Sequence, residues 1–99
     1  MAAVIAACRL VLHLPESQSL KDKRQVLRSL QSRLTDAYSV SVAETGSQDK
    51  WQSAELLVAY ASSDSRHADE VLAKVIAFVE SYHLPVELLD AETELIHAF

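Results

Sequence analysis

The chain has 99 residues, of which 49% are hydrophobic and 23% charged, with one glycine and two prolines. A chain of this length and composition forms one compact domain with a single hydrophobic core, which excludes a mainly disordered protein. The net charge of -5 argues against indiscriminate binding to nucleic acid, but residues 1–40 carry six cations against three carboxylates and residues 41–99 carry three cations against eleven.

The first predicted elements are a strand and a helix. Residues 4–14, VIAACRLVLHL, are apolar and rich in β-branched side chains, which predicts a central strand. One of its two faces is wholly apolar and includes Cys8, so we expect this lone cysteine to be a small buried hydrophobe. Ser19 with Asp22 three residues later is typical of a helix start, and leucines at helical spacing extend this helix to about Asp36.

A long hairpin follows the first helix. Residues 38–44, YSVSVAE, alternate as a strand does, and residues 45–50 turn the chain around its only glycine. The segment WQSAELLVAYA, residues 51–61, predicts the returning strand.

A second helix and an edge strand complete the predicted elements. Ser63 or Asp64 begins the helix, and His83-Leu84-Pro85 ends it. Residues 86–96, VELLDAETELI, read as an exposed strand whose carboxylates prevent pairing with other chains.

This order of elements predicts an α+β fold with the ferredoxin-like βαββαβ arrangement. Two right-handed crossovers place both helices on one face of a four-stranded antiparallel sheet and leave the other face open. We expect a single ferredoxin-like domain over residues 1–99. Glu44 and Trp51 should then lie at the same end of the molecule as the start of the first helix.

Cations are unusually dense in the first turns of this helix, where the helix macrodipole disfavours positive charge. On a helical wheel with Leu20 at zero, Arg24, Arg28 and Lys21 fall at about 40°, 80° and 100°. They form one exposed stripe, which we call the basic stripe. Converging cations of this kind suit an anion such as an RNA phosphate, although solvated surface charge is the alternative.

Lys23 differs from these three cations. It falls at about 300° on the same wheel, between Leu30 and Leu34, and therefore on the face that packs against the sheet. A lone buried charge is costly, so we predict a structural ion pair with Glu44, with snorkelling of the lysine stem as the alternative.

Signatures of catalysis and metal binding are absent from the sequence. The histidines are scattered, and no Cys-x-x-Cys or Gly-x-Ser-x-Gly motif occurs. We therefore predict no metal site, no cofactor and no enzymatic activity. No apolar run approaches the length of a membrane span and no signal-peptide pattern is present, so we expect a cytoplasmic protein that contacts no membrane.

The open face of the predicted sheet lacks the exposed aromatic residues with which RNA-recognition domains stack bases. Its outward positions are mostly apolar, which suggests a protein partner or a second copy of the chain. The residues that motivate a homodimer are Ile5, Ala7, Val11, Leu57 and Ala59.

The segments LHLPESQSLKDKRQVLRSL, VSVAE, WQSAEL and LLDAETE together resemble the YlxP-like family, small bacterial proteins classed as a domain of unknown function. The resemblance spans essentially the whole chain, and its signature falls on residues 19–24. It implies a ferredoxin-like fold and a gene that lies among genes for translation initiation and ribosome maturation. It implies no catalytic residues.

Three functions follow from these observations. The first is a non-enzymatic factor that contacts ribosomal RNA or a ribosome-associated protein. The second is a homodimeric interaction module, and the third is a domain that binds a small anion at the first helix start, with His83 as the candidate general base. The residues predicted to serve the first function are Lys21, Arg24 and Arg28, assisted by Arg9, Arg33 and Trp51.

Overall fold

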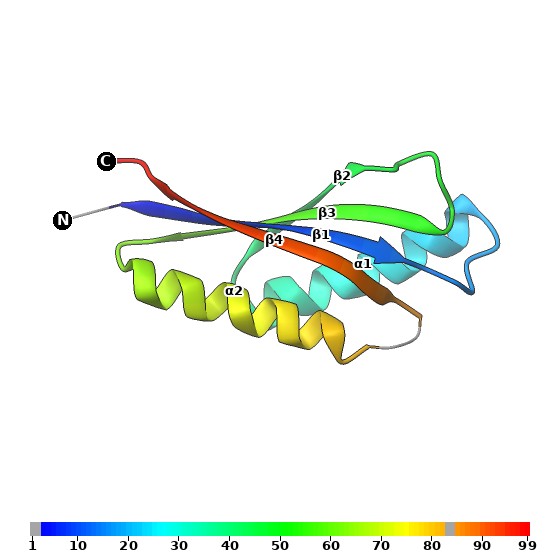
Figure 1. Ribbon diagram of the computed structural model, residues 1–99. Coiled ribbons are helices and arrows are strands. Elements are labelled where there is room, and N and C mark those ends of the chain that lie inside the picture. The colour runs from blue at the N-terminus through cyan, green and yellow to red at the C-terminus, as the bar shows by residue number, and fades with distance from the viewer. Residues whose placement is uncertain (1–2, 83–84) are drawn as a thin grey trace.

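A computed structural model describes residues 3–82 and 85–99, and both helices lie on one face of a single sheet (Figure 1). The elements in chain order are β1 (Val4–His13), α1 (Leu20–Tyr38), β2 (Ser41–Gly46), β3 (Ser53–Ser62), α2 (Ser65–Glu80) and β4 (Glu87–His97). The strands pair antiparallel in the order β2-β3-β1-β4. The predicted α+β ferredoxin-like fold is therefore confirmed.

The hydrophobic core lies between the sheet and the two helices. Strand β1 contributes the apolar face expected from its alternation, with every residue on that face at most 2% exposed: Val4, Ala6, Cys8, Leu10 and Leu12. Buried leucines of α1 and valines of α2 pack against it. Burial raises the pKa of the Cys8 thiol to about 11, so the thiol stays protonated near neutral pH and behaves as a core hydrophobe.

Helix α1 begins at the predicted cap and ends two residues later than predicted. The Ser19 hydroxyl oxygen accepts a hydrogen bond from the Asp22 backbone N–H at 3.1 Å. The helix continues to Tyr38 because this side chain packs edge-to-face on Phe78 of α2, with 6.0 Å between ring centroids. The chain then leaves the helix through Ser39, whose φ of 56° lies in the left-handed region.

Other boundaries differ from the predictions by up to three residues. Strand β2 begins at Ser41 because the preceding tyrosine belongs to α1, and β3 begins at Ser53. Asp64, one of the two predicted caps, starts α2 by accepting hydrogen bonds from the next backbone N–H groups. Helix α2 ends at Glu80, and the predicted helix end at His83-Leu84 lies outside the described residues.

The open face of the sheet is more polar than the sequence suggested. Arg9, in the middle of β1, donates to Glu55 on β3 at 2.9 Å and also pairs with Glu92 on β4. Hydrogen bonding to these two carboxylates raises the pKa of Arg9, and Glu92 has the larger effect. Ile5 and Leu57 are each 39% exposed on the same face. The open face is therefore amphipathic with an acidic β4 side, rather than apolar as expected.

The left-handed Ser39 yields a prediction about stability. An L-residue pays a steric penalty in this conformation, whereas glycine adopts it freely, so Ser39→Gly should stabilise the fold by about 0.5 to 1 kcal/mol. The midpoint of urea denaturation measures this change. Ser41→Gly, which lies in an extended strand, is the matched control and should destabilise. A loss of stability in Ser39→Gly would contradict the prediction.

Candidate functional site

The start of α1 is already capped by the chain's own oxygen atoms. Besides the Ser19 cap, Asp22 Oδ2 accepts a hydrogen bond from the Gln18 backbone N–H at 3.0 Å. The Ser17 hydroxyl also donates to the Ser19 carbonyl. An anion that binds here would consequently be held by side chains more than by free backbone N–H groups.

The side chain of Lys23 points from this first turn into the protein interior. It is 1% exposed and is the largest fully buried side chain in the described structure. Its ammonium nitrogen lies 2.9 Å from Glu44 Oε2, at the end of β2. It also donates to three backbone carbonyls of the segment that joins β2 to β3: Ser47 at 2.6 Å, Lys50 at 2.6 Å and Ser53 at 2.9 Å. We call these four acceptors the lysine cage.

A lysine ammonium has three N–H donors, and the three carbonyls account for all of them. Glu44 Oε2 has no hydrogen-bond partner of its own among the described residues, so its contact with Lys23 is essentially coulombic. The sequence anticipated the ion pair but not the carbonyls. The cage therefore does more than neutralise a charge, because it holds the β2–β3 connection against the start of α1.

Gln52 joins this connection to the β1–α1 loop. Its side-chain amide donates to the carbonyls of Pro15 at 3.4 Å and Ser17 at 3.1 Å. Its own carbonyl accepts from the Leu14 backbone N–H at 2.9 Å and lies 3.0 Å from His13 Nδ1. The two loops and the first turn of α1 thus form one hydrogen-bonded end of the molecule.

The basic stripe lies on the outer surface of this end. Lys21, Arg24 and Arg28 are all exposed, and no carboxylate oxygen of the described residues lies within 4.0 Å of their charged groups. Arg24 and Arg28 flank Glu44 in a shallow hollow of about 170 Å³. Because the buried Lys23 offsets the charge of Glu44, the net charge around this hollow stays positive.

The three predicted assisting residues do not all join the stripe. Trp51 lies in the chain between two members of the lysine cage, Lys50 and Ser53, and is 52% exposed at the same end. Arg9 lies on the open face of the sheet, on the opposite side from the helices, and is occupied by two carboxylates. Arg33 lies about 180° around α1 from Arg24 and faces α2 instead.

Lys50 is a cation at this end that the sequence analysis did not single out. Its carbonyl belongs to the lysine cage and its side chain is exposed. The sequence held one signal for it, namely that it directly precedes Trp51, which was expected at the same end of the molecule as the start of α1. Nothing in the sequence signals the backbone carbonyls, because any residue carries one.

No cluster of three or more histidine, cysteine or acidic side chains suited to a metal occurs in the part of the chain that the structure describes. His83, the candidate general base, lies outside that part. Among the described helices, none is long and apolar enough to cross a membrane.

The element order and the four-stranded antiparallel sheet define a small α+β domain of the ferredoxin-like class. Residues 5–93 match a family described as "Protein of unknown function (DUF503)", and the chain belongs to this family. It is 34% identical over 77 residues to "Uncharacterized protein YlxP" of Bacillus subtilis (strain 168), a match that covers 78% of this chain and 82% of that protein.

A solved structure shares the fold at low sequence identity. It is a C-terminal segment of the alpha subunit of aIF2 from Pyrococcus abyssi, with a TM-score of 0.52 and 14% identity. The match covers 98% of this chain, which spans about half of the length of that solved chain. At this identity the likeness concerns the fold alone.

The lysine cage yields the second prediction. Lys23→Met leaves three carbonyls and one carboxylate without their cation, and we expect it to lower the free energy of unfolding by about 3 to 5 kcal/mol. Lys21→Met changes an exposed side chain two residues earlier in the helix and should alter the free energy of unfolding by less than about 0.5 kcal/mol. Chemical denaturation of both variants provides the comparison.

Glu44→Gln separates the contribution of the ion pair from that of the carbonyls. If the carbonyls hold the ammonium, this variant keeps all three hydrogen bonds and loses less stability than Lys23→Met. Equal losses in the two variants would show that Glu44 is the principal partner.

Proposed function

We propose that this protein is a non-enzymatic cytoplasmic factor that binds RNA, and ribosomal RNA in particular, through the end of the molecule that carries the basic stripe. The observation that carries the proposal is that Lys21, Arg24 and Arg28 are exposed and free of carboxylate partners within the described structure. Three cations that the protein leaves unpaired, in a position that the helix macrodipole disfavours, are available for an external polyanion.

The neighbouring loop supplies further groups that suit RNA. Lys50 adds a cation, and the half-exposed Trp51 presents an aromatic surface on which an unpaired base can stack. The lysine cage restricts the backbone on both sides of these residues, which reduces the entropy lost when they bind.

The rest of the surface limits the contact to a small area. On the open face, carboxylates of β3 and β4 outnumber Arg9 of β1, the strand that lies between them, and Arg9 is already paired with two of these carboxylates. An RNA backbone approaching the open face would be repelled. We therefore propose a defined docking place on a ribosomal subunit or its precursor, not a broad footprint.

The resemblance to the YlxP-like family supports this proposal without carrying it, because it implies a gene among those for translation initiation and ribosome maturation. The likeness to the segment of the aIF2 alpha subunit adds no support, since it concerns the fold alone.

Cosedimentation with purified bacterial ribosomal subunits across a salt series tests the proposal. Removing two phosphate contacts with Arg24→Gln/Arg28→Gln should weaken the association and reduce the slope of log affinity against log salt by about 1.4 to 1.8. The variant should fold normally, because it removes charges that oppose the macrodipole.

The matched control is Arg66→Gln/Lys74→Gln on α2, which changes the net charge by the same amount at two exposed positions. Its salt dependence should equal that of the wild type. An equal weakening in both double variants, or an association that ignores salt, would contradict a contact through the basic stripe.

A second candidate function, self-association through the open sheet face, is favoured by the exposed apolar side chains Ile5, Leu57 and Ile96. Light scattering at high protein concentration should then report a dimer, and Leu57→Arg should convert it to a monomer. A wild-type protein that is monomeric at every concentration excludes this candidate. Lys74→Gln, on α2, is the control and should leave the dimer intact.

A further inference from the structure

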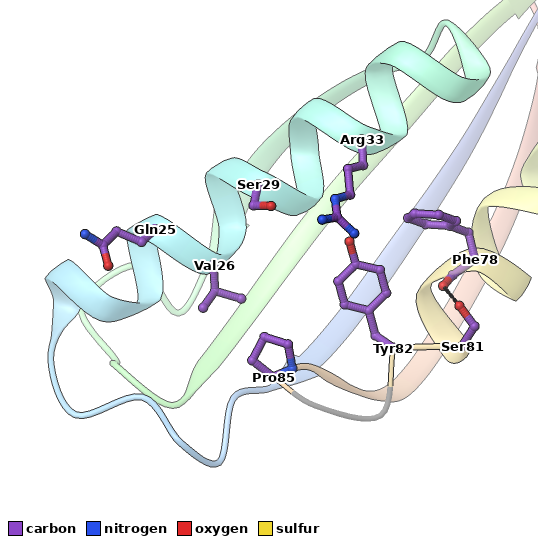
Figure 2. A pocket seen from close by; sticks show the side chains of 8 residues that line it. All are labelled: Gln25, Val26, Ser29, Arg33, Phe78, Ser81, Tyr82 and Pro85. Atoms are coloured by element: carbon purple, nitrogen blue, oxygen red, sulfur yellow. Dashed lines mark hydrogen bonds between the residues drawn. The ribbon is translucent and has the colours of Figure 1, made fainter.

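A groove of about 670 Å³ lies between α1 and α2, on the side of α1 that faces away from the basic stripe (Figure 2). The function proposed above makes no use of it. The groove is lined by Gln25, Val26, Ser29 and Arg33 of α1 and by Phe78, Ser81, Tyr82 and Pro85 at and beyond the end of α2. Its volume is in the range of small-molecule sites. Its lining is mixed, with an apolar part made by Val26, Phe78, Pro85 and the Tyr82 ring and polar groups from the other four residues.

Aromatic side chains make one wall of this groove. Phe78 packs edge-to-face on Tyr82, with 5.4 Å between ring centroids, and on Tyr38 of α1 at 6.0 Å. The Ser81 hydroxyl is tied to the Phe78 carbonyl at 2.6 Å. Because each ring is held by the next, this wall is preorganised for an apolar or aromatic ligand.

Arg33 is the only ionisable cation or carboxylate side chain among the lining residues. Its guanidinium carbon lies 5.9 Å from the centroid of the Tyr82 ring, and the guanidinium points toward the Tyr82 hydroxyl in Figure 2. No described carboxylate lies within 4.0 Å of it, in contrast to Arg9, which has two. Arg33 therefore has no counter-charge among the described residues, and an anionic ligand could supply one.

The Tyr82 hydroxyl is a second group without a partner. It is buried, and no described residue forms a hydrogen bond with it. A buried hydroxyl in this state costs about 1 to 3 kcal/mol relative to a bonded one. Because this hydroxyl is covered in the structure, an acceptor oxygen bound beside Arg33 would reach and satisfy it only once the side chains over it moved aside.

We propose that this groove binds a small monocarboxylate with an apolar or aromatic body. The aromatic wall would contact the body, Arg33 would pair with the carboxylate as a planar two-donor fork, and the Tyr82 hydroxyl would donate to the same group. A carboxylate fits better than a phosphate ester, because the lining offers one cation and the chain as a whole carries a net charge of -5.

Three probes that share a body but differ in charge test the proposal: phenylacetate, phenylacetamide and phenethylammonium. Titrations followed by amide chemical shifts should show saturable changes for phenylacetate around Ser29, Phe78 and Ser81. The affinity for the neutral amide should be at least about tenfold lower, since the amide loses a charge-assisted hydrogen bond. The ammonium should not bind. The larger 1-naphthylacetate should bind at the same residues as phenylacetate.

Variants locate the carboxylate. Arg33→Gln should weaken phenylacetate binding about tenfold and remove its preference over phenylacetamide, whereas Tyr82→Phe should weaken it less while keeping that preference. Arg28→Gln, on the other side of the same helix, is the control and should bind as the wild type does.

Several results would overturn the proposal. They are an absence of saturable shifts with both carboxylates, equal affinity for the carboxylate and the amide, an unchanged affinity in Arg33→Gln, or shifts confined to the basic stripe. None of these results would decide whether the protein binds RNA, because the titrations report on the groove side of α1. The cosedimentation reports on the basic stripe, on the opposite side of that helix.

Discussion

The contact between the Lys23 ammonium and the lysine cage determines how one whole end of this protein is arranged. A buried charge is stable only when its donors are satisfied and an opposite charge lies near it, and here three carbonyls do the first and Glu44 the second. Because the carbonyls come from a loop, the lysine also fixes the path of that loop. Gln52 then ties the loop to the chain that precedes α1.

Helix α1 distributes its cations among three separate environments. Lys23 is buried in its cage, the basic stripe is exposed to solvent, and Arg33 faces the groove beside α2. This division follows from helix geometry. Each residue is rotated by about 100° around the helix axis relative to the one before it, so nearby side chains point into different surroundings. The proposed RNA contact and the proposed ligand groove would therefore share no side chain with each other or with the buried Lys23.

The two faces of the sheet differ as strongly as the sides of α1. The helix-facing side is closed and mostly apolar, with Glu44 paired to Lys23 at one end. The open side combines half-exposed apolar residues with carboxylates and a paired Arg9. Three exposed cations gather at the start of α1, whereas β4 carries four carboxylates and no lysine or arginine. This separation explains how an acidic protein can present a surface for an anionic partner.

Local patterns in the sequence determined the elements, their order and the fold class, because hydrophobic periodicity and capping residues act over a few neighbouring residues. The same periodicity placed Lys23 on the buried side of α1 and Glu44 close to it. Boundaries such as the end of α1 at Tyr38 were missed, since that residue is held by an aromatic contact with a distant helix.

Only the tertiary structure decided what surrounds each charged side chain. The carbonyls around Lys23 depend on the path of a loop, and the pairing of Arg9 with Glu55 and Glu92 depends on the register of three strands and on the bulge between β1 and β4. The groove beside Arg33 depends on how the ends of α1 and α2 approach each other. Such contacts join residues far apart in the chain, so no periodicity along the sequence encodes them.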